Sequence, residues 1–370
     1  MSIRKTNISI LVAAILACPF SAGAGLYGFT EINPYTPEEK ILDIDVPPKQ
    51  VTNFRETLRH NVEMLSNYAY LRDKNFQIII HEGQELLNKS LWEYHLTGYN
   101  EARARPTQAK DPSFLFKFKK HRYGTNDVIG TPPPEYLTNI TGIVLNKPYS
   151  LNRSISPGLL ASKLKIIAFD LCTAPETCMD YIKKSVAGNI LLQTGSSATT
   201  IFRNIEEQPV INENARNIFK LFEAENILYL NDESSFRDKY DLIKQLRNTN
   251  FDVVIIRPQF NNKEAYTTDE VNSLKFKKNG TRRLIIAEMN LTEANPEQYY
   301  WKKKWQLGKP SWLRRKSFSN QGSIIAEYWN DEWRKIIGNH FKSIIDTKYD
   351  GAFFTGLENH KYFEYQLPLE

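Results

Sequence analysis

Carboxylates dominate the polar residues that directly follow the apolar runs of this chain. These polar residues are His81, Glu82, Glu101, Asp170, Asn231, Asp232, Arg257, Asn290, Glu293, Thr355 and Glu358. The sequence has no Ser-His-Asp arrangement, no glycine-rich phosphate loop and no HExxH zinc motif. Acid–base chemistry between two carboxyl groups is therefore the enzymatic option that the residues favour. Glycoside hydrolysis uses such a pair, one carboxyl protonating the leaving oxygen while the other attacks the sugar or activates water.

Five of the six tryptophans fall within one short window near the C-terminus. They are Trp301, Trp305, Trp312, Trp329 and Trp333, accompanied by Tyr299, Tyr300 and Tyr328. Flat aromatic rings suit the C–H faces of sugars, which favours a carbohydrate cleft. Core packing around a long loop is the alternative for part of the cluster, including Trp333 on its helix.

The elements that must position these residues are strands alternating with helices. Apolar, β-branched runs predict eight strands, at 76–80, 95–99, 165–169, 190–193, 227–230, 253–256, 284–289 and 352–354. Helical patterns occur at 51–71, 236–247 and 333–347. Such alternation predicts an α/β fold, a (β/α)8 TIM barrel, in which the loops after the strands build the active site. Residues 105–150, which contain a basic stretch and a Pro-rich stretch, are interpreted as an insertion after the second strand.

Composition excludes several classes of protein. The 370 residues are 41% hydrophobic and 24% charged, so the chain is neither disordered, collagenous nor coiled-coil. A net charge of +6 is too small for a dedicated nucleic-acid binder. Three cysteines cannot form a disulfide scaffold, so the core depends on hydrophobic burial. We expect one domain over 51–370 after an extended arm at 25–50.

The N-terminus has the order of a secretory signal. Arg4 and Lys5 precede the apolar run 8–20, and Ala22-Gly23-Ala24 offers a cleavage site. The run is too short to span a bilayer, and no later segment is long and apolar, so we expect a signal peptide at 1–24 and no integral membrane segment in the mature chain. This predicts a periplasmic or secreted protein. Lipid anchoring through Cys18 fits less well, because Pro19 follows it.

Cys172 and Cys178 are the cysteines that remain after cleavage. In an exported protein they can form a small disulfide loop, although two buried free thiols are equally compatible with the spacing. No histidine or further cysteine lies nearby, so we expect no metal at these cysteines, and nothing else in the sequence indicates a metal or an organic cofactor.

Residues 226–364 contain an ordered series of motifs. FDVVIIRPQF, LIIAEMNLTEANPEQYYWKKKWQLGKPSWL, EYWNDEWRKII and YDGAFFTGLENHKYF together resemble glycoside hydrolase family 114, the endo-α-1,4-polygalactosaminidase-like TIM barrels. Earlier segments, NFQIIIHEGQELL, LTGYNEAR and KLKIIAFDLCTAPETCMDYI, resemble strands that follow the Asp-Gly block in that family. A closed barrel places its last strand beside its first, so this rotated order is compatible with the same architecture.

The resemblance implies site residues and also departures from the family pattern. It makes Glu293 the retained acid, whereas Arg257 and Thr355 stand where the family has Asp, and Thr292 and Asn295 replace the Gly and second Glu of its Gly-Glu-Ala-Glu block. We predict Asp170 as the second catalytic carboxyl. The other predicted contributors to substrate binding are Tyr300, Trp301, Trp305, Glu101, Glu358 and Arg257.

The expected partner is a polysaccharide or oligosaccharide, not nucleic acid. Lys302, Lys303, Lys304, Arg314, Arg315 and Lys316 lie among the aromatic residues and would repel a cationic galactosamine polymer, so a neutral or anionic glycan is expected to fit better, unless these side chains are an ordinary solvated rim. The alternative to a hydrolase is a barrel that has lost its acids and binds glycan or serves as an envelope protein.

Overall fold

A computed structural model describes most of the chain from residue 52 onward. The described residues are 52–90, 93, 96, 133–153, 155, 157–160, 162–198, 200–205 and 210–366. The predicted signal peptide, the N-terminal arm, Glu101 and most of the predicted insertion lie outside them.

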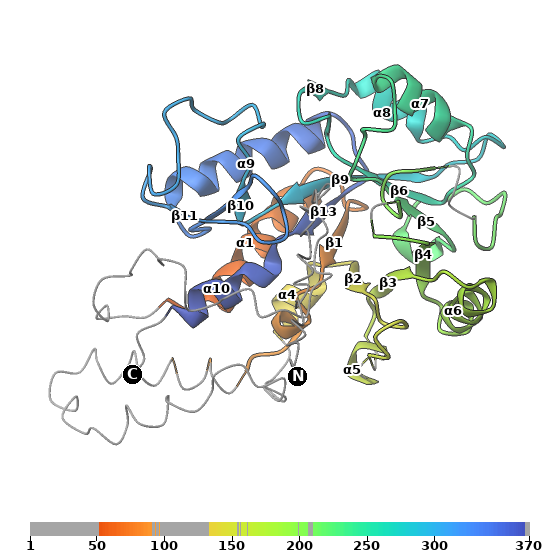
Figure 1. Cartoon of the computed structure of the whole chain (residues 1–370), viewed down its shortest axis with the longest axis horizontal. Helices are drawn as coiled ribbons and strands as arrows, with labels where there is room; N and C mark the ends of the chain where they lie inside the picture. The colour runs from red at the N-terminus through yellow and green to blue at the C-terminus, as the bar shows by residue number, and fades with distance from the viewer. Residues whose placement is uncertain are drawn as a thin grey trace, which may run out of the picture.

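Eight parallel strands form one sheet at the centre of the molecule (Figure 1). They are β1 (Gln77–His81), β2 (Gly142–Asn146), β3 (Lys165–Leu171), β4 (Leu191–Gly195), β5 (Ile227–Tyr229), β6 (Val253–Ile256), β9 (Leu284–Asn290) and β13 (Gly351–Thr355). Their order is β4-β3-β2-β1-β13-β9-β6-β5, so the last strand pairs with the first.

The two edges of this sheet approach each other. The amide group of Gln193 on β4 donates to the Tyr229 carbonyl of β5 at 3.1 Å and accepts from the Tyr229 N–H at 2.6 Å. A side chain thus bridges the edges where main-chain pairing is missing. The result is an α/β fold whose sheet is nearly barrel-shaped.

The predicted strands agree with the observed ones except at the second position. Strand β2 is Gly142–Asn146, which the sequence analysis placed inside the insertion. Of the predicted strand 95–99 only Leu96 is described, and it is helical. The prediction of a strand there was wrong, because the apolar run that is buried on both faces and pairs with β1 and β3 is the later one.

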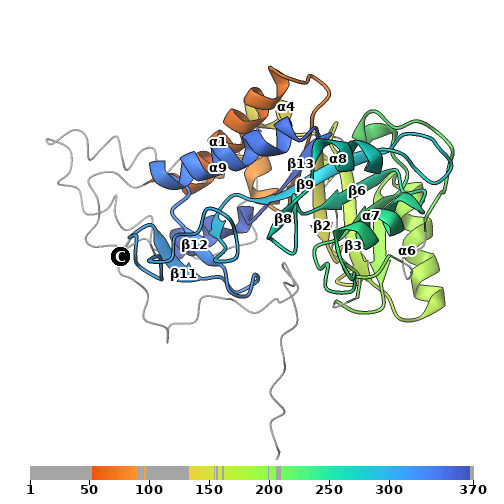
Figure 2. The ribbon, with the colours of Figure 1, turned by 90° about the horizontal axis from the view of Figure 1, so that it is seen from above.

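Helices flank the sheet. The longer ones are α1 (Phe54–Tyr70), α6 (Pro175–Ala187), α7 (Lys239–Arg247) and α9 (Asp331–Asp346), and the shorter ones are α4 (Pro134–Thr138), α5 (Pro157–Leu160), α8 (Thr268–Leu274) and α10 (His360–Tyr365). Side chains of Asn53, Asp238 and Asn330 accept hydrogen bonds from the first turns of α1, α7 and α9. Figure 2 shows α1 and α9 together on one side of the sheet and α6 and α7 on the other.

The strands are apolar on both faces because the core has two layers. Alternate residues such as Ile79, Ile167 and Ile286 pack in the interior of the curved sheet. Their neighbours, such as Ile78 and Ile285, pack under the helices. Leu221, in a turn of 3₁₀-helix (η3, Leu221–Glu223), is part of the interior layer.

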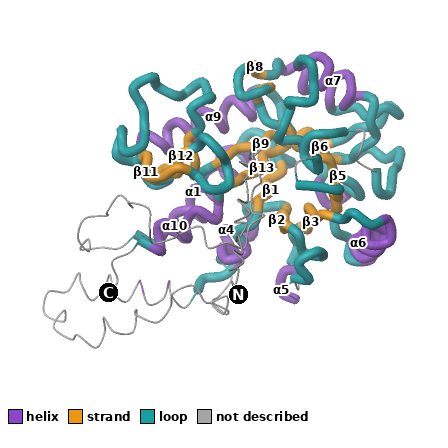
Figure 3. The backbone as a smooth tube through the Cα atoms, in the orientation of Figure 1, coloured by secondary structure: helices purple, strands orange, loops and turns teal. Residues whose placement is uncertain are grey.

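Two small sheets extend from the carboxyl ends of β6 and β9 (Figure 3). The hairpin of β7 (Gln259–Phe260) and β8 (Glu264–Ala265) follows β6. Strands β10 (Glu293–Ala294), β11 (Leu313–Lys316) and β12 (Ile324–Ala326) form an antiparallel sheet after β9. Segments that follow β6 and β9 supply most of the walls of the site described below.

Cys172 and Cys178 are joined in a disulfide between the end of β3 and α6. Of the two states that the sequence left open, the structure therefore has the bonded one. In the part of the chain that the structure describes, no helix combines the length and the apolar character needed to cross a bilayer.

Candidate functional site

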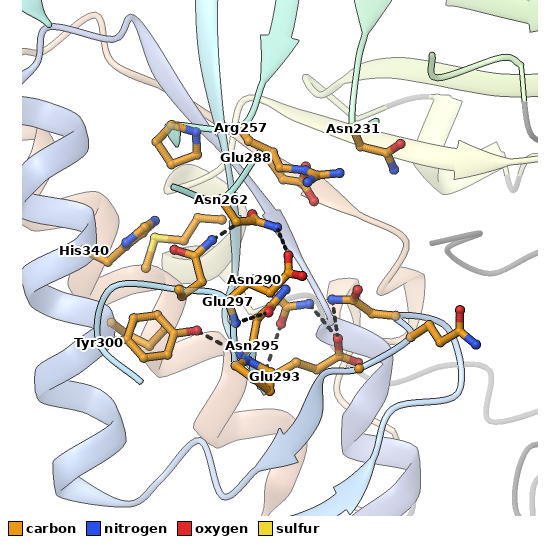
Figure 4. Close-up of a pocket in the computed structure, with 18 residues that line it drawn as sticks. Asn231, Arg257, Asn262, Glu288, Asn290, Glu293, Asn295, Glu297, Tyr300 and His340 are labelled. Atoms are coloured by element: carbon orange, nitrogen blue, oxygen red, sulfur yellow. Dashed lines mark hydrogen bonds between the residues drawn. The ribbon is translucent and has the colours of Figure 1, made fainter. Parts of the chain in front are cut away.

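A cavity of about 430 Å³ opens at the carboxyl ends of β6 and β9 (Figure 4). It is lined by Asn231, Arg257, Pro258, Asn262, Glu288, Met289, Asn290, Glu293, Asn295, Pro296, Glu297, Gln298, Tyr300, Asn320, Gln321, Gly322, Ile337 and His340. In parallel α/β sheets, ligands bind at this end of the strands. Three residues predicted from the sequence, Arg257, Glu293 and Tyr300, meet here.

Amide side chains are the commonest polar groups of the lining. They come from Asn231, Asn262, Asn290, Asn295, Gln298, Asn320 and Gln321. Gln298 donates to the Asn262 carbonyl oxygen at 2.9 Å, and Asn262 donates to Glu297 at 3.2 Å. An amide both donates and accepts, as a hydroxyl group does. The lining therefore suits a ligand that is rich in hydroxyl groups.

Glu293 is 2% exposed and accepts four side-chain hydrogen bonds. One carboxylate oxygen accepts from the Ser317 hydroxyl at 2.7 Å and the Asn359 amide at 3.0 Å. The other accepts from the Asn290 amide at 3.1 Å and the Asn320 amide at 3.2 Å. Burial raises the pKa of Glu293, an effect that the charge of Glu358 reinforces and the donors oppose.

Local backbone structure fixes where Glu293 points. Asn290, the last residue of β9, accepts hydrogen bonds from the N–H groups of Thr292 and Glu293 at 3.0 and 2.9 Å. Asn359, at the end of the turn η4 (Leu357–Asn359), donates to the Thr292 hydroxyl at 2.8 Å as well as to Glu293. Gly356 has a φ of +82°, and a Cβ there would lie 2.5 Å from the Asn290 side-chain oxygen. The turn after β13 can pack against Glu293 only because this residue is glycine.

Arg257 lies beside Glu288, at the wall of the cavity opposite Glu293 (Figure 4). Its guanidinium is 3.3 Å from the carboxylate of Glu233, which is 2% exposed. Burial raises the pKa of Glu233 to about 7; the Arg257 charge lowers this pKa, and the Glu288 charge raises it. One guanidinium is thus grouped with two carboxyls at this wall.

His340 and Tyr300 form a third part of the lining. Burial lowers the pKa of His340 to about 4, so its imidazole is neutral at physiological pH. The Nδ1 atom of His340 is buried and has no hydrogen-bond partner among the described residues. The Tyr300 hydroxyl accepts from the Asn295 N–H at 3.1 Å and so holds the chain after β10 in place.

Neither Trp301 nor Trp305 lines the cavity. Trp305 is 7% exposed and packs edge-on between Trp301 and Trp312, with ring centroids 5.4 and 5.0 Å apart. Trp312 in turn contacts Trp333 of α9 at 5.6 Å. These rings form an aromatic core under the small sheet, which is the alternative that the sequence left open for part of the cluster.

Asp170, the predicted second carboxyl, lies away from the cavity. It is fully buried at the end of β3, four strands from β9 in the sheet. Its carboxylate accepts main-chain hydrogen bonds from Tyr149 at 2.7 Å, Ser150 at 3.2 Å and Leu171 at 2.8 Å. These contacts fix the loop after β2, so the structure gives Asp170 a positioning role in the fold.

Glu358 does not line the cavity either. It is half-buried in η4, and burial raises its pKa. Glu101 lies outside the described residues. Within the described residues no group of three or more His, Cys, Asp or Glu side chains is placed to hold a metal ion.

Sequence reasoning missed Glu288 and His340. Only residues that follow an apolar run were considered, whereas Glu288 lies inside β9 and His340 inside α9. A charged residue in the middle of the apolar run LIIAEMN was the available signal, because a buried carboxylate in a strand needs a reason to be there.

No family model matches the chain. An uncharacterized protein of Methanocaldococcus jannaschii is 28% identical over 123 residues, which are 33% of this chain and 34% of that protein. Uncharacterized proteins of Thermotoga maritima (26% over 78 residues, 21% and 24% of the two chains) and Deinococcus radiodurans (24% over 103 residues, 28% and 32%) are also similar. The matches span at most 34% of the length of these relatives.

Proposed function

We propose that this protein is an exported TIM-barrel glycoside hydrolase that cleaves polysaccharide in the cavity at the carboxyl ends of its strands. The observation that carries the proposal is a buried carboxyl, Glu293, with a raised pKa, in a cavity lined mainly by amide groups. Amides suit the hydroxyl groups of a sugar, and a carboxyl with a raised pKa suits proton donation to a glycosidic oxygen. The resemblance of the 226–364 motifs to family 114 supports the same chemistry.

The lining favours an amino-sugar polymer as substrate. The sequence alone favours a neutral or anionic glycan because of six basic residues between 302 and 316. None of these six lines the cavity, whose charged lining is Arg257, Glu288, Glu293 and Glu297. Glu288 and Glu297 outnumber the single guanidinium even when Glu293 holds its proton, so the lining attracts an ammonium group. We therefore propose α-1,4-linked galactosamine chains, the substrate that the resemblance also implies.

Glu293 acts as the general acid in this proposal. To hold a proton it must lose one accepted hydrogen bond, because a protonated carboxyl donates from one oxygen. Asn320 makes the longest of the four bonds, at 3.2 Å, and itself lines the cavity. A sugar that displaces the Asn320 amide would leave Glu293 free to donate its proton to the glycosidic oxygen.

Glycan binding without cleavage is the second candidate. The observations that favour it are the four hydrogen bonds that occupy Glu293 and the presence of Arg257 where the resemblance implies an acid. A carboxylate whose acceptor sites are all occupied can serve simply to hold the 317–322 loop. This candidate predicts binding with no turnover.

Reducing-end release distinguishes the two candidates. The purified mature protein is incubated with α-1,4-polygalactosamine, polygalacturonate and a neutral α-1,4-glucan, beside the Glu293→Gln variant. A Glu264→Gln variant is the matched control, because Glu264 lies on β8, is exposed and does not line the cavity. We expect release from polygalactosamine by the wild type and the control and none by Glu293→Gln. Binding with no release by any of the three would favour the second candidate.

A further inference from the structure

We propose that Glu288 is the second catalytic carboxyl, which takes a proton from the water that attacks the sugar. This inference rests on the proposed hydrolase function and adds a residue that neither the order of the motifs nor the ends of the strands indicated. It replaces Asp170, whose carboxylate is held by three main-chain N–H groups away from the cavity.

The register between β6 and β9 places Glu288 beside Arg257 in the lining of the cavity. Strand β6 pairs with β9 so that Ile256 lies opposite Ala287, and the next residues are Arg257 and Glu288. Neighbouring residues in a parallel pair are about 4.8 Å apart and project to the same face. Arg257 and Glu288 therefore project together, and both line the cavity.

The positive charge of Arg257 stabilises an ionised carboxylate at Glu288. Glu288 is 8% exposed, and a buried carboxylate is costly unless a positive charge lies close by. Arg257 supplies that charge, and its guanidinium is also 3.3 Å from the carboxylate of Glu233, which does not line the cavity. The ion pair with Glu233 thus fixes the position of Arg257, and the guanidinium offsets the charge of Glu288 at the cavity wall.

Glu288 and Glu293 face the cavity from opposite walls (Figure 4). In inverting glycoside hydrolases the acid and the base stand on opposite sides of the sugar and leave room for a water molecule. A cavity of about 430 Å³ lies between the two carboxyls. His340 also lines this cavity.

The proposed step is a single displacement at the anomeric carbon. The Glu293 carboxyl gives its proton to the glycosidic oxygen while the bond between that oxygen and the anomeric carbon breaks. Water forms the new bond to the anomeric carbon, and Glu288 accepts the proton that this water loses. The products are two sugar chains, one with a new reducing end, and solvent exchange returns the proton from Glu288 to Glu293.

Three variants test Glu288: Glu288→Gln, Glu288→Ala and the control Glu264→Gln. The probe is an oligomer of α-1,4-linked galactosamine labelled at its reducing end, and kcat and KM are measured separately. We expect Glu288→Gln to lower kcat by about 10²–10⁴-fold with KM unchanged, as for removal of a general base. We expect sodium azide to restore turnover by Glu288→Ala and to give a glycosyl azide, because azide can attack the anomeric carbon without losing a proton.

The outcomes separate this inference from the proposed function. Turnover by the wild type that Glu288→Gln leaves within about threefold would overturn the role of Glu288 and leave the hydrolase intact. A loss of turnover in Glu288→Ala that azide does not rescue, with KM raised as well, would show a structural role and also overturn it. No turnover by the wild type would overturn both proposals.

Discussion

Replacing Glu293 by Gln should destabilise the fold as well as stop turnover. Each Glu293 oxygen accepts two hydrogen bonds, one pair from Ser317 and Asn359 and the other from Asn290 and Asn320. The nitrogen of a Gln side chain must replace one of these oxygens. Against Asn290 and Asn320 it would meet two N–H donors and lose both bonds. Against Ser317 and Asn359 only the Asn359 bond is lost, because a hydroxyl can turn and accept.

The magnitude follows from the less costly orientation. A hydrogen bond to a charged group contributes about 1.5–3 kcal/mol and a neutral one about 0.5–1.5 kcal/mol. Glu293→Gln loses one charged bond and converts the remaining ones to neutral bonds, while it removes the cost of burying a charge. If relief of the buried charge offsets the weakening of the three remaining bonds, the one lost bond sets the net loss, at about 1.5–3 kcal/mol in the free energy of unfolding.

Urea unfolding at pH 7.5 measures this loss as a lower midpoint with an unchanged slope. Glu264→Gln, on the exposed hairpin, removes a surface ion pair with Lys239 (3.0 Å) and should change the unfolding free energy by less than about 1 kcal/mol. The loss in Glu293→Gln should grow in acid, because a raised pKa means that the folded wild type takes up a proton more readily than the unfolded chain and gains stability as the pH falls, whereas Gln does not titrate. A Glu293→Gln protein as stable as the wild type at pH 7.5 would refute the four-bond account of this residue.

Three further predictions concern the walls of the cavity and the fold. The pKa of Glu233 is about 7 in the fold against 4.5 in the unfolded chain, so its stabilising contribution is complete below pH 4.5 and is lost as the pH rises through 7. In urea titrations, the unfolding free energy of the wild type minus that of Glu233→Gln should fall by about 3 kcal/mol between pH 4 and 8. A pH-independent difference would contradict this. The double variant Cys172→Ser, Cys178→Ser opens a short disulfide loop and should lower the unfolding free energy by about 2 kcal/mol relative to the oxidised wild type. Equal stability of the two proteins would show that the disulfide does not constrain the unfolded chain. Gly356→Ala should lower the free energy of unfolding by at least about 1–2 kcal/mol because of the positive φ at this position. It should also reduce turnover, because the added Cβ meets the Asn290 side chain that orients Glu293. Thermal melts and reducing-end release measure the two effects, and an unperturbed variant would contradict the packing described for this turn.

The sheet was predictable because most of its strands are apolar on both faces. Runs such as 253–256 and 284–289 have no helical period and must be buried, so their type and position follow from pattern alone. Strand β2 was missed because its run follows a Pro-rich stretch and resembles part of an insertion. Pairing across the sheet decides such a case, and pairing is a property of the fold that no local pattern contains.

The site was predictable only in part. Glu293 and Arg257 follow strands and were found by position. Glu288 lies inside a strand, and Asp170 lies near the end of β3 but accepts hydrogen bonds from main-chain N–H groups. A carboxylate near the end of a strand can either bind the main chain of a neighbouring loop or line the cavity. Only the direction of its side chain distinguishes the two cases, and the sequence does not contain that direction. The tryptophans show the same limit, since a ring such as Trp305 suits a core as well as a sugar.

The most direct test of the account is the initial rate of reducing-end release from α-1,4-polygalactosamine by the mature protein and by Glu293→Gln, measured at a temperature at which both remain folded. The account predicts release by the wild type and at least about a 10²-fold lower rate for the variant. No release by the wild type, or an equal rate for both proteins, would contradict it.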